Sequence, residues 1–487
     1  MPENYVAVID IGSNAVRLVV YDGLNRAPFK IHSERTVCNL GADLATTGRL
    51  NPEAVEKSLN SLRRFSGLLA AMKIKNVHAV ATAAVRDATD GKDFVENVRK
   101  EFNFPVRVID GAEEARLSAQ GVLANSVGDN SGIIGDYGGG SLELIVVENN
   151  QVRQKASLPL GSHRLLAENS RAAQAKTITT LLENTGFLQD HAGCDFYALG
   201  GAWRSLAKAH IHMARHPLNI LDHYQVDGKK AAGFAALIAR QSNASLAKTA
   251  GVSQSRTRDM GVAALTMELL FEKIRPRRLI FSATGLREGL LFDRLPPAVR
   301  QQDPLIAGCM KIAVKISRFQ ELKAFKVLFN WMEPLFAAED ENITRLLEAS
   351  CLLSDSGWFE HEDYQADHAF RRVLALPFYG IDHAGRAFLA LSQYVRYQGA
   401  LGVNDTTGPA ETLLDEKTVH RAVIAGLAQH LGYLLTGGAL DLLRGSALRL
   451  TQHHLILKLD GQLNAAIIGE TLRDLAKAMG REAMIED

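Results

Sequence analysis

The segment VAVIDIGSNAVRLVVY, residues 6–21, decides the fold of this chain, because it returns in a second form as GIIGDYGGGSLELIVV, residues 132–147. In both copies an aspartate is followed two positions later by a glycine, then by four residues, a charged residue, a leucine and a β-branched run. Asp10 of the first copy corresponds to Asp136 of the second, and Arg17 corresponds to Glu143. We therefore expect one supersecondary unit to occur twice.

Each copy predicts a β-hairpin, because a short apolar strand is followed by a glycine-containing turn and a second apolar strand. An aspartate at the end of a strand offers hard oxygen atoms to a metal ion, and glycines let backbone N–H groups approach a phosphate closely. A single Asp-x-Gly motif is explained equally well by a tight turn. The duplication in register favours a functional role, in which two facing turns clamp a phosphate chain.

The composition is typical of a globular protein with several domains. The chain has 487 residues, of which 47% are hydrophobic and 22% are charged, so about two to four domains are expected. The net charge of +1 argues against bulk electrostatic binding of nucleic acid. The amino terminus lacks a basic segment followed by an apolar one, and no apolar run approaches about 18 residues, so we expect neither secretion nor membrane insertion.

The cysteine content indicates a reducing compartment. The four cysteines are widely spaced and form no Cys-x-x-Cys motif, so reduced thiols and a cytoplasmic location are expected. These residues are Cys38, Cys194, Cys309 and Cys351.

The pattern of the chain changes near residue 300. Before Pro296 and Pro297, β-rich runs alternate with amphipathic helical stretches, as in stacked α/β units. Residues 301–440 carry helical periodicity, with few strand signals. At the carboxyl end, LRLTQHHLILKLDGQ alternates in polarity up to an Asp-Gly turn at Asp460 and precedes a helical segment, so a small strand and helix subdomain is expected over 441–487.

Several strand ends are expected to meet at one edge of the α/β region. The stretch VRVIDGAEEARLSAQ predicts a strand, a glycine and a helix that opens at Glu113 and Glu114. Because a helix start and the end of the next strand share one edge of an open sheet, Glu114 and Asp136 should lie together. The acidic pair is also explained by the preference of helix starts for carboxylates. Further turns expected at this edge contain Arg86, Gly200, Gly201, Gly285, Arg287 and Glu288.

With these motifs in place, the chain resembles the exopolyphosphatase and guanosine-pentaphosphatase (Ppx/GppA) family, within the sugar-kinase, Hsp70 and actin-like superfamily. The resemblance rests on DIGSNAVRL, ATAAVRDA, GAEEARLSAQG, DYGGGSLEL, LGGAWRSLA and SATGLREGLL, in family order over roughly the first three hundred residues. It implies an α/β fold with two actin-like, ribonuclease H-like lobes around a cleft, over 1–125 and 126–300. A mainly α-helical domain like the HD phosphohydrolases is implied over 301–440, before the small α/β piece at 441–487.

The resemblance also implies roles for particular residues. Glu114 matches the catalytic glutamate that activates the attacking water, and Asp136, Glu143 and Asp10 match acids associated with Mg²⁺. The positions that match phosphate-binding residues of the family are Gly12, Ser13, Asn14, Arg17, Arg86, Gly138, Gly139, Gly140 and Ser141.

By this resemblance the expected reaction is Mg²⁺-dependent hydrolysis of terminal phosphoanhydride bonds of inorganic polyphosphate, which releases orthophosphate. The alternatives are a guanosine-pentaphosphate 5′-phosphohydrolase, which would use the same residues, and a non-catalytic regulator that binds polyphosphate or alarmone nucleotides such as guanosine tetraphosphate. A kinase of the same superfamily is disfavoured, because the EEAR block would have no counterpart. The implied partners include no nucleic acid and no membrane, and a homodimer is expected on resemblance alone.

The helical region departs from the HD pattern, whose metal chemistry needs adjacent histidine and aspartate ligands. The sequence contains no His-Asp dipeptide; Ser354 precedes Asp355 where one would be placed, and His361 and His368 stand apart. We therefore expect a helical scaffold without the metal site.

A basic stripe in the helical region has two possible explanations. The segment KIAVKISRFQELKAFK predicts one helical arc of basic side chains, which is either a solvated face or, less favoured, a path for a polyanion. Its members are Lys311, Lys315, Arg318, Lys323 and Lys326.

Overall fold

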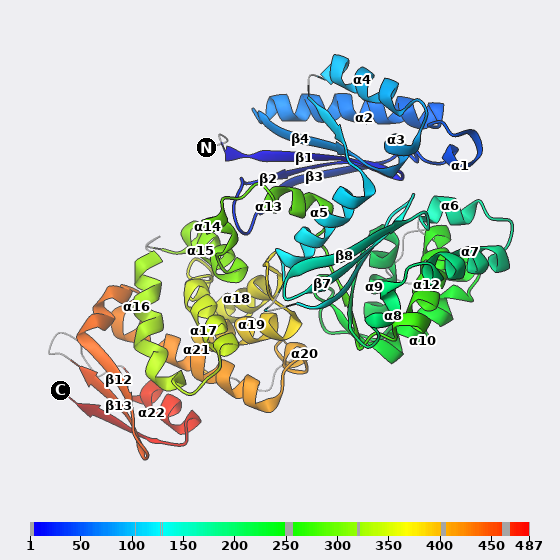
Figure 1. The fold of residues 1–487 in the computed structure, drawn as a ribbon. Coiled ribbons are helices and arrows are strands. Elements are labelled where there is room, and N and C mark those ends of the chain that lie inside the picture. Colours follow the sequence, from blue (N-terminus) through cyan, green and yellow to red (C-terminus); the bar gives the residue numbers. More distant parts are fainter. Residues whose placement is uncertain are drawn as a thin grey trace. The chain divides into compact units, whose positions relative to one another are not determined.

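The structure, a computed structural model, describes residues 4–102, 104–126, 128, 130–248, 257–318, 322–400, 406–459 and 468–486 (Figure 1). The chain forms two compact units, Met1–Gln301 and Gln302–Asp487. Within the first unit two sheets are present, and each is the centre of one α/β lobe.

The first lobe is built on a five-stranded sheet in the order β3-β2-β1-β4-β5. Strands β1, β2 and β3 are joined as antiparallel hairpins, whereas β4 and β5 run parallel to β1. Helices α2 and α4 lie along one face, where Phe65 and Phe94 pack against Ile9 (Figure 1). The elements are β1 (Val6–Ile11), β2 (Ala15–Tyr21), β3 (Lys30–Val37), α1 (Leu44–Thr47), α2 (Pro52–Ala71), β4 (Asn76–Ala81), α3 (Ala83–Asp87), α4 (Gly91–Phe102) and β5 (Val106–Val108).

The second lobe is built on a six-stranded sheet in the order β10-β11-β9-β6-β7-β8. Helices α9 and α12 cover one face, where Trp203 and Phe271 pack on Phe196. The elements are β6 (Gly132–Tyr137), β7 (Leu142–Glu148), β8 (Gln151–Leu158), α6 (Ser162–Leu166), α7 (Arg171–Glu183), α8 (Phe187–Asp190), β9 (Asp195–Leu199), α9 (Gly201–Met213), β10 (Gln225–Asp227), α10 (Gly228–Ala239), α11 (Asn243–Leu246), α12 (Thr257–Ile274), β11 (Arg278–Phe281), α13 (Leu286–Phe292) and α14 (Pro297–Arg300).

The duplicated hairpin predicted from the sequence is confirmed. Strands β1 and β2 pair antiparallel with Asp10 opposite Arg17, and β6 and β7 pair antiparallel with Asp136 opposite Glu143. Both hairpins occupy the same place in their sheets, because β1 and β6 each have a parallel neighbour on the other side. The aspartate and the charged residue are therefore cross-strand partners in both lobes.

Helix α5 (Gly111–Leu123) lies between the two sheets (Figure 1). Its Ala115 and Val122 pack on Ile134 of the second sheet, whereas Leu117 joins Val8 in a cluster on the first sheet. The helix begins two residues before the predicted start at Glu113, because the side chain of Asp110 accepts a hydrogen bond from the Glu113 backbone at 2.7 Å and caps the helix.

Helices α5 and α13 touch through glycines. A Cβ atom on Gly121 would lie 2.0 Å from the carbonyl oxygen of Gly285, and one on Gly289 would lie 1.8 Å from that of Leu117. Leu290 of α13 packs in the cluster on the first sheet, although α13 follows the strands of the second lobe in sequence. The two helices therefore pack at backbone distance on the inner face of the first sheet.

The second unit is mostly helical and ends in a small sheet, as the sequence predicts. Its strand order is β12-β13-β14, with the β12–β13 hairpin closing at residues 451–453 and β14 adding in parallel. The predicted turn at Asp460 lies outside the described residues. The elements are α15 (Pro304–Ile316), α16 (Leu322–Met332), η3 (Glu333–Phe336), α17 (Glu341–Leu353), η4 (Glu362–Tyr364), α18 (Gln365–Ala375), α19 (His383–Gln398), α20 (Gly408–Glu411), α21 (Glu416–Thr436), η5 (Leu440–Gly445), β12 (Ser446–Leu450), β13 (His454–Leu459), α22 (Gly469–Ala478) and β14 (Glu482–Glu486).

The prediction of one continuous basic arc over KIAVKISRFQELKAFK was wrong. Helix α15 ends at Ile316 because Ser317 takes an extended conformation, and α16 begins at Leu322. Arg318 turns inward, where its guanidinium pairs with Asp355 at 2.8 Å and its backbone N–H binds the same carboxylate, also at 2.8 Å. The five basic residues are therefore divided between two helices and an internal ion pair.

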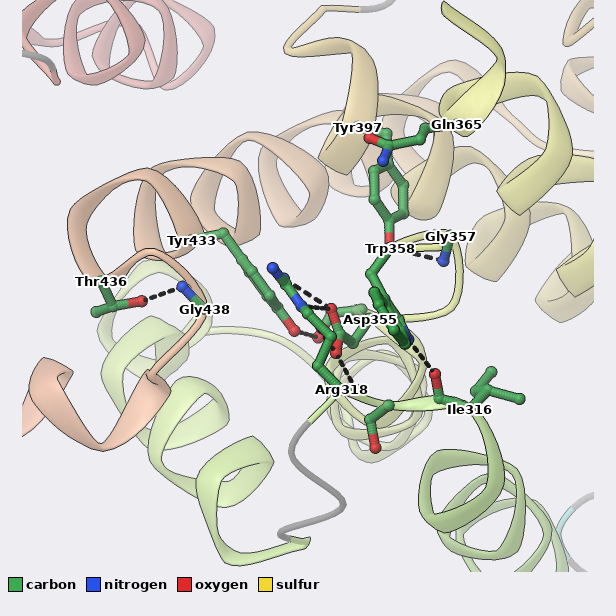
Figure 2. Close-up of polar contacts among 12 residues, drawn as sticks. Ile316, Arg318, Asp355, Gly357, Trp358, Gln365, Tyr397, Tyr433, Thr436 and Gly438 are labelled. Atoms are coloured by element: carbon green, nitrogen blue, oxygen red, sulfur yellow. Dashed lines mark hydrogen bonds and ion pairs between the residues drawn. The ribbon is translucent and has the colours of Figure 1, made fainter. Parts of the chain in front are cut away.

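The Arg318–Asp355 pair is the centre of a polar cluster inside the second unit (Figure 2). The guanidinium of Arg318 also lies 5.7 Å from the ring centre of Tyr433. No group of three or more His, Cys, Asp or Glu side chains that could hold a metal ion occurs among the described residues. In this part of the second unit the carboxylate of Asp355 is thus neutralised by an arginine.

Among the residues that the structure describes, no helix combines the length and apolarity needed to cross a bilayer.

Candidate functional site

A cavity of about 200 Å³ lies where the two glycine turns of the first unit face each other. It is lined by residues from both lobes, including Glu114 of α5. The residues expected at the site that line it are Asp10, Gly12, Ser13, Asn14, Arg17, Glu114, Asp136, Gly138, Gly139, Gly140 and Ser141. Arg86 and Glu143 lie just outside it, and both interact with Glu114.

The two glycine turns have the same internal geometry. The Gly12 N–H donates to the Ala15 carbonyl at 3.0 Å, and the Gly138 N–H donates to the Ser141 carbonyl at 2.9 Å. The turns also contact each other, because a Cβ atom on Gly139 would lie 3.2 Å from Cβ of Ser13. A side chain at position 139 would make a tight contact there, so glycine favours this approach of the two turns.

The carboxylates of the site are held in a buried cluster. Asp136 accepts a hydrogen bond from the Ser118 hydroxyl at 2.6 Å, and Glu143, which is 1% exposed, accepts one from Ser157 at 3.0 Å. Burial raises the pKa of Asp136. Burial, followed by repulsion from Glu114 and Asp136, raises the pKa of Glu143 well above its usual range.

Glu114 has the properties of a weak base at neutral pH. Burial raises the pKa of its carboxyl to about 7, with Asp136 adding to the rise, while Arg86 opposes it. The Arg86 guanidinium donates to Oε2 of Glu114 at 3.1 Å. A carboxylate with a pKa near 7 in a cavity can accept a proton from water and later release it.

Of the four arginines that line the cavity, the sequence assigns Arg17 to phosphate binding and places Arg287 at this edge of the sheet. The other two are Arg35 of β3 and Arg204 of α9. Arg204 is fixed by hydrogen bonds to the carbonyls of Ser282 and Ala283, at 3.1 and 3.2 Å. Arg204, which the sequence analysis did not single out, stands in the GGAWRSLA motif, and this motif is the signal that could have identified it.

The arginines give the cavity its positive charge. Arg287 pairs with Asp10 at 2.8 Å, so a metal ion at Asp10 would have to share this carboxylate with a guanidinium. Burial and the neighbouring Arg287 lower the pKa of Arg17 to about 10. Since arginines that repel one another gain from an anion placed between them, the cavity can accept a polyanion.

The chemistry of the acids fits a Mg²⁺ ion only in part. The part of the chain that the structure describes contains no ready-made set of three acidic or histidine ligands. Mg²⁺ is, however, commonly held by one or two carboxylates together with water and substrate phosphates. Asp136, which lines the cavity, and the neighbouring Glu143 could serve in this way.

Two family models match the chain. Residues 19–298, more than half of the chain, match the Ppx/GppA phosphatase family. The chain belongs to the Ppx/GppA phosphatase family. Residues 309–484 match the model for the exopolyphosphatase C-terminal region.

Curated relatives are similar over part of their length. Guanosine-5′-triphosphate,3′-diphosphate pyrophosphatase from Aeromonas hydrophila is 31% identical over 155 residues, which cover 32% of this chain and 31% of the relative. The protein of the same name from Aliivibrio fischeri is 31% identical over 161 residues, which cover 33% of this chain and 32% of the relative. The chain thus aligns with about a third of the length of these relatives.

Solved structures share the fold of the first unit. An exopolyphosphatase from Cytophaga hutchinsonii superposes with a TM-score of 0.54 at 24% identity, covering 59% of this chain and 97% of its own. The Ppx/GppA family member from Aquifex aeolicus gives a TM-score of 0.51 at 26% identity, covering 59% of this chain and 96% of its own. The actin-like fold of the two lobes is therefore that of the family.

Proposed function

We propose that this protein is an exopolyphosphatase, which hydrolyses the terminal phosphoanhydride bond of inorganic polyphosphate and releases orthophosphate. The observation that carries this proposal is the position of Glu114, a carboxylate with a pKa near 7, in the same cavity as both glycine turns and four arginines. The C-terminal family match and the name of the Cytophaga hutchinsonii relative support polyphosphate as the substrate.

In the proposed reaction the terminal phosphoryl group is bound by backbone N–H groups of the two turns and by the arginines. Their positive charge neutralises the phosphate oxygens, which is the main requirement for phosphoryl transfer. Glu114 orients a water molecule in line with the scissile bond and accepts its proton through Oε1, because Oε2 is bound by Arg86. Orthophosphate and a polyphosphate shortened by one unit are the products.

When bound, Mg²⁺ would neutralise charge on the phosphate oxygens. Asp136 and Glu143 are the residues that would hold it, and the resemblance names Asp10 beside them. Release of phosphate should therefore require added Mg²⁺.

The alternative substrate is guanosine pentaphosphate, which the names of the Aeromonas and Aliivibrio relatives favour. Both substrates end in a phosphoanhydride, so the cavity accommodates the reacting groups of either. Phosphate release should be measured side by side on polyphosphate and on guanosine pentaphosphate. A higher kcat/KM for the nucleotide would overturn polyphosphate as the preferred substrate.

The role of Glu114 is tested by Glu114→Gln with Glu113→Gln as the matched control. The two residues are adjacent in α5, but Glu113 is bound by Arg107 outside the cavity. We expect Glu114→Gln to bind polyphosphate as the wild type does and to lose turnover by a factor of about 10² to 10⁴. Glu113→Gln should retain turnover, and an equally active Glu114→Gln would refute the assignment.

We also propose a cytoplasmic homodimer. Light scattering of the purified chain measures its mass in solution, and a mass of one chain would overturn the dimer.

A further inference from the structure

Charged side chains form a continuous bridge from the second lobe to Glu114. Arg164 of α6 donates to Oδ2 of Asp87 at 2.7 Å, and Arg86 donates through Nε to Oδ1 of the same carboxylate at 3.1 Å. Arg86 then donates through Nη1 to Oε2 of Glu114 at 3.1 Å. Asp87 and Arg86 belong to α3 of the first lobe, so the bridge crosses from one lobe to the other.

The end of the bridge in the second lobe is fixed to the second glycine turn. Nε of Arg164 donates to the carbonyl of Gly140 at 3.0 Å. The backbone N–H of His163 donates to the carbonyl of Gly139 at 2.9 Å, which holds the start of α6 on the same turn. The position of Arg164 therefore follows the position of the turn that is proposed to bind phosphate.

The other end of the bridge sets the orientation of Glu114. Nη1 of Arg86 also donates to the carbonyl of Ile109, at 3.1 Å, so its guanidinium is held on three sides. Among the described residues no hydrogen bond reaches Oε1 of Glu114, so this oxygen is the one left for water. Asp87 does not line the cavity.

Stability alone does not explain the bridge. The side chains of Arg164 and Asp87 are 35% and 33% exposed, and pairs at such sites contribute only about 0 to 1 kcal/mol. The geometry has a different consequence. The guanidinium of Arg86 is paired with two carboxylates, those of Asp87 and Glu114. Without Asp87, Glu114 would be its only acidic partner among these residues.

We propose that Asp87 is a positioning residue, which holds Arg86 against one oxygen of Glu114 and, through Arg164, couples the orientation of this carboxylate to the second glycine turn. The inference rests on the proposed hydrolysis of a phosphoanhydride. Without Asp87, the guanidinium of Arg86 is held only by the carbonyl of Ile109 and by Glu114, so it can turn toward the substrate or engage both oxygens of Glu114. In either case Glu114 accepts a proton from water less readily.

The first experiment compares Asp87→Asn with Asp93→Asn, the same substitution at the exposed first turn of α4. Phosphate release from tripolyphosphate should show kcat reduced about tenfold in Asp87→Asn, with KM changed less than about twofold. Asp93→Asn should equal the wild type, and Asp87→Glu should recover part of the lost kcat. Unfolding temperatures of all variants should agree, which excludes a merely structural effect.

The second experiment tests the coupling between the lobes with Arg164→Ala. If the bridge acts as a unit, Arg164→Ala alone lowers kcat, and the double variant with Asp87→Asn is no slower than Asp87→Asn alone. Additive losses, or Asp87→Asn with wild-type kcat, would overturn the proposal. A wild type that releases no phosphate from any substrate would overturn the proposed function, and the role of Asp87 with it.

Discussion

At the scale of single residues, the buried carboxyl of Glu114, which is proposed to act as the base, lowers the stability of the folded protein when it is ionised. Its carboxyl has a pKa of about 7 in the folded protein, mainly because it is buried, against an ordinary value near 4.5. Between these two values the folded state binds more protons than the unfolded state, so stability falls as pH rises from about 4.5 to 7. Above pH 7 the whole cost of the buried carboxylate is present.

We therefore expect Glu114→Gln to be more stable than the wild type at pH 8, by up to about 3 kcal/mol, and equally stable at pH 4. Urea unfolding at both values of pH measures the difference. Glu113→Gln is again the control, since the Glu113 side chain is 27% exposed. A variant that is less stable than the wild type at pH 8 would show that the carboxylate is compensated by groups such as Arg86.

At the scale of elements, the contact between α5 and α13 requires glycine. A Cβ atom on Gly289 would lie 1.8 Å from the carbonyl oxygen of Leu117, a backbone atom that cannot move away without shifting α5. Helix α5 carries Glu114, and α13 carries Arg287, so separating the helices also displaces two lining residues of the cavity.

We expect Gly289→Ala to cost about 2 kcal/mol or more and to lower turnover. Gly67→Ala in α2 is the matched control, because no atom lies within 4 Å of its added Cβ atom. That substitution should stabilise the protein by about 0.5 to 1 kcal/mol through helix propensity. Thermal unfolding and phosphate release measured on both variants test these expected changes in stability and turnover. A Gly289→Ala variant with the stability and turnover of the wild type would contradict close backbone packing of the two helices.

The sequence predicted those elements whose signal is local. Asp10 and Asp136 stand at the ends of short apolar strands, so both hairpins and their convergence could be inferred from pattern and sheet geometry alone. Contacts between residues that are far apart in the sequence could not be inferred in this way. Arg318 leaves the expected helical arc because Asp355, distant in sequence, supplies a buried partner. Arg204 joins the cavity because the carbonyls of Ser282 and Ala283 orient it, and no spacing in the chain reveals that contact.

At the scale of the whole molecule, the first unit contains every residue that lines the cavity between the glycine turns. It has its own hydrophobic clusters on both sheets. The solved chain from Aquifex aeolicus covers 59% of this chain with 96% of its own length, a share close to that of the first unit, Met1–Gln301. The first unit should therefore fold by itself.

We expect a fragment of residues 1–301 to unfold cooperatively and to hydrolyse tripolyphosphate with a kcat within about tenfold of that of the full chain. The same fragment with Glu114→Gln is the control for contaminating phosphatases. Short substrates are the appropriate probe, because every residue that lines the cavity of about 200 Å³ lies within the fragment. A folded fragment without turnover would show that the second unit supplies part of the active site. Turnover of the full chain on polyphosphates of different length, compared with that of the fragment, would then show which substrate lengths depend on the second unit.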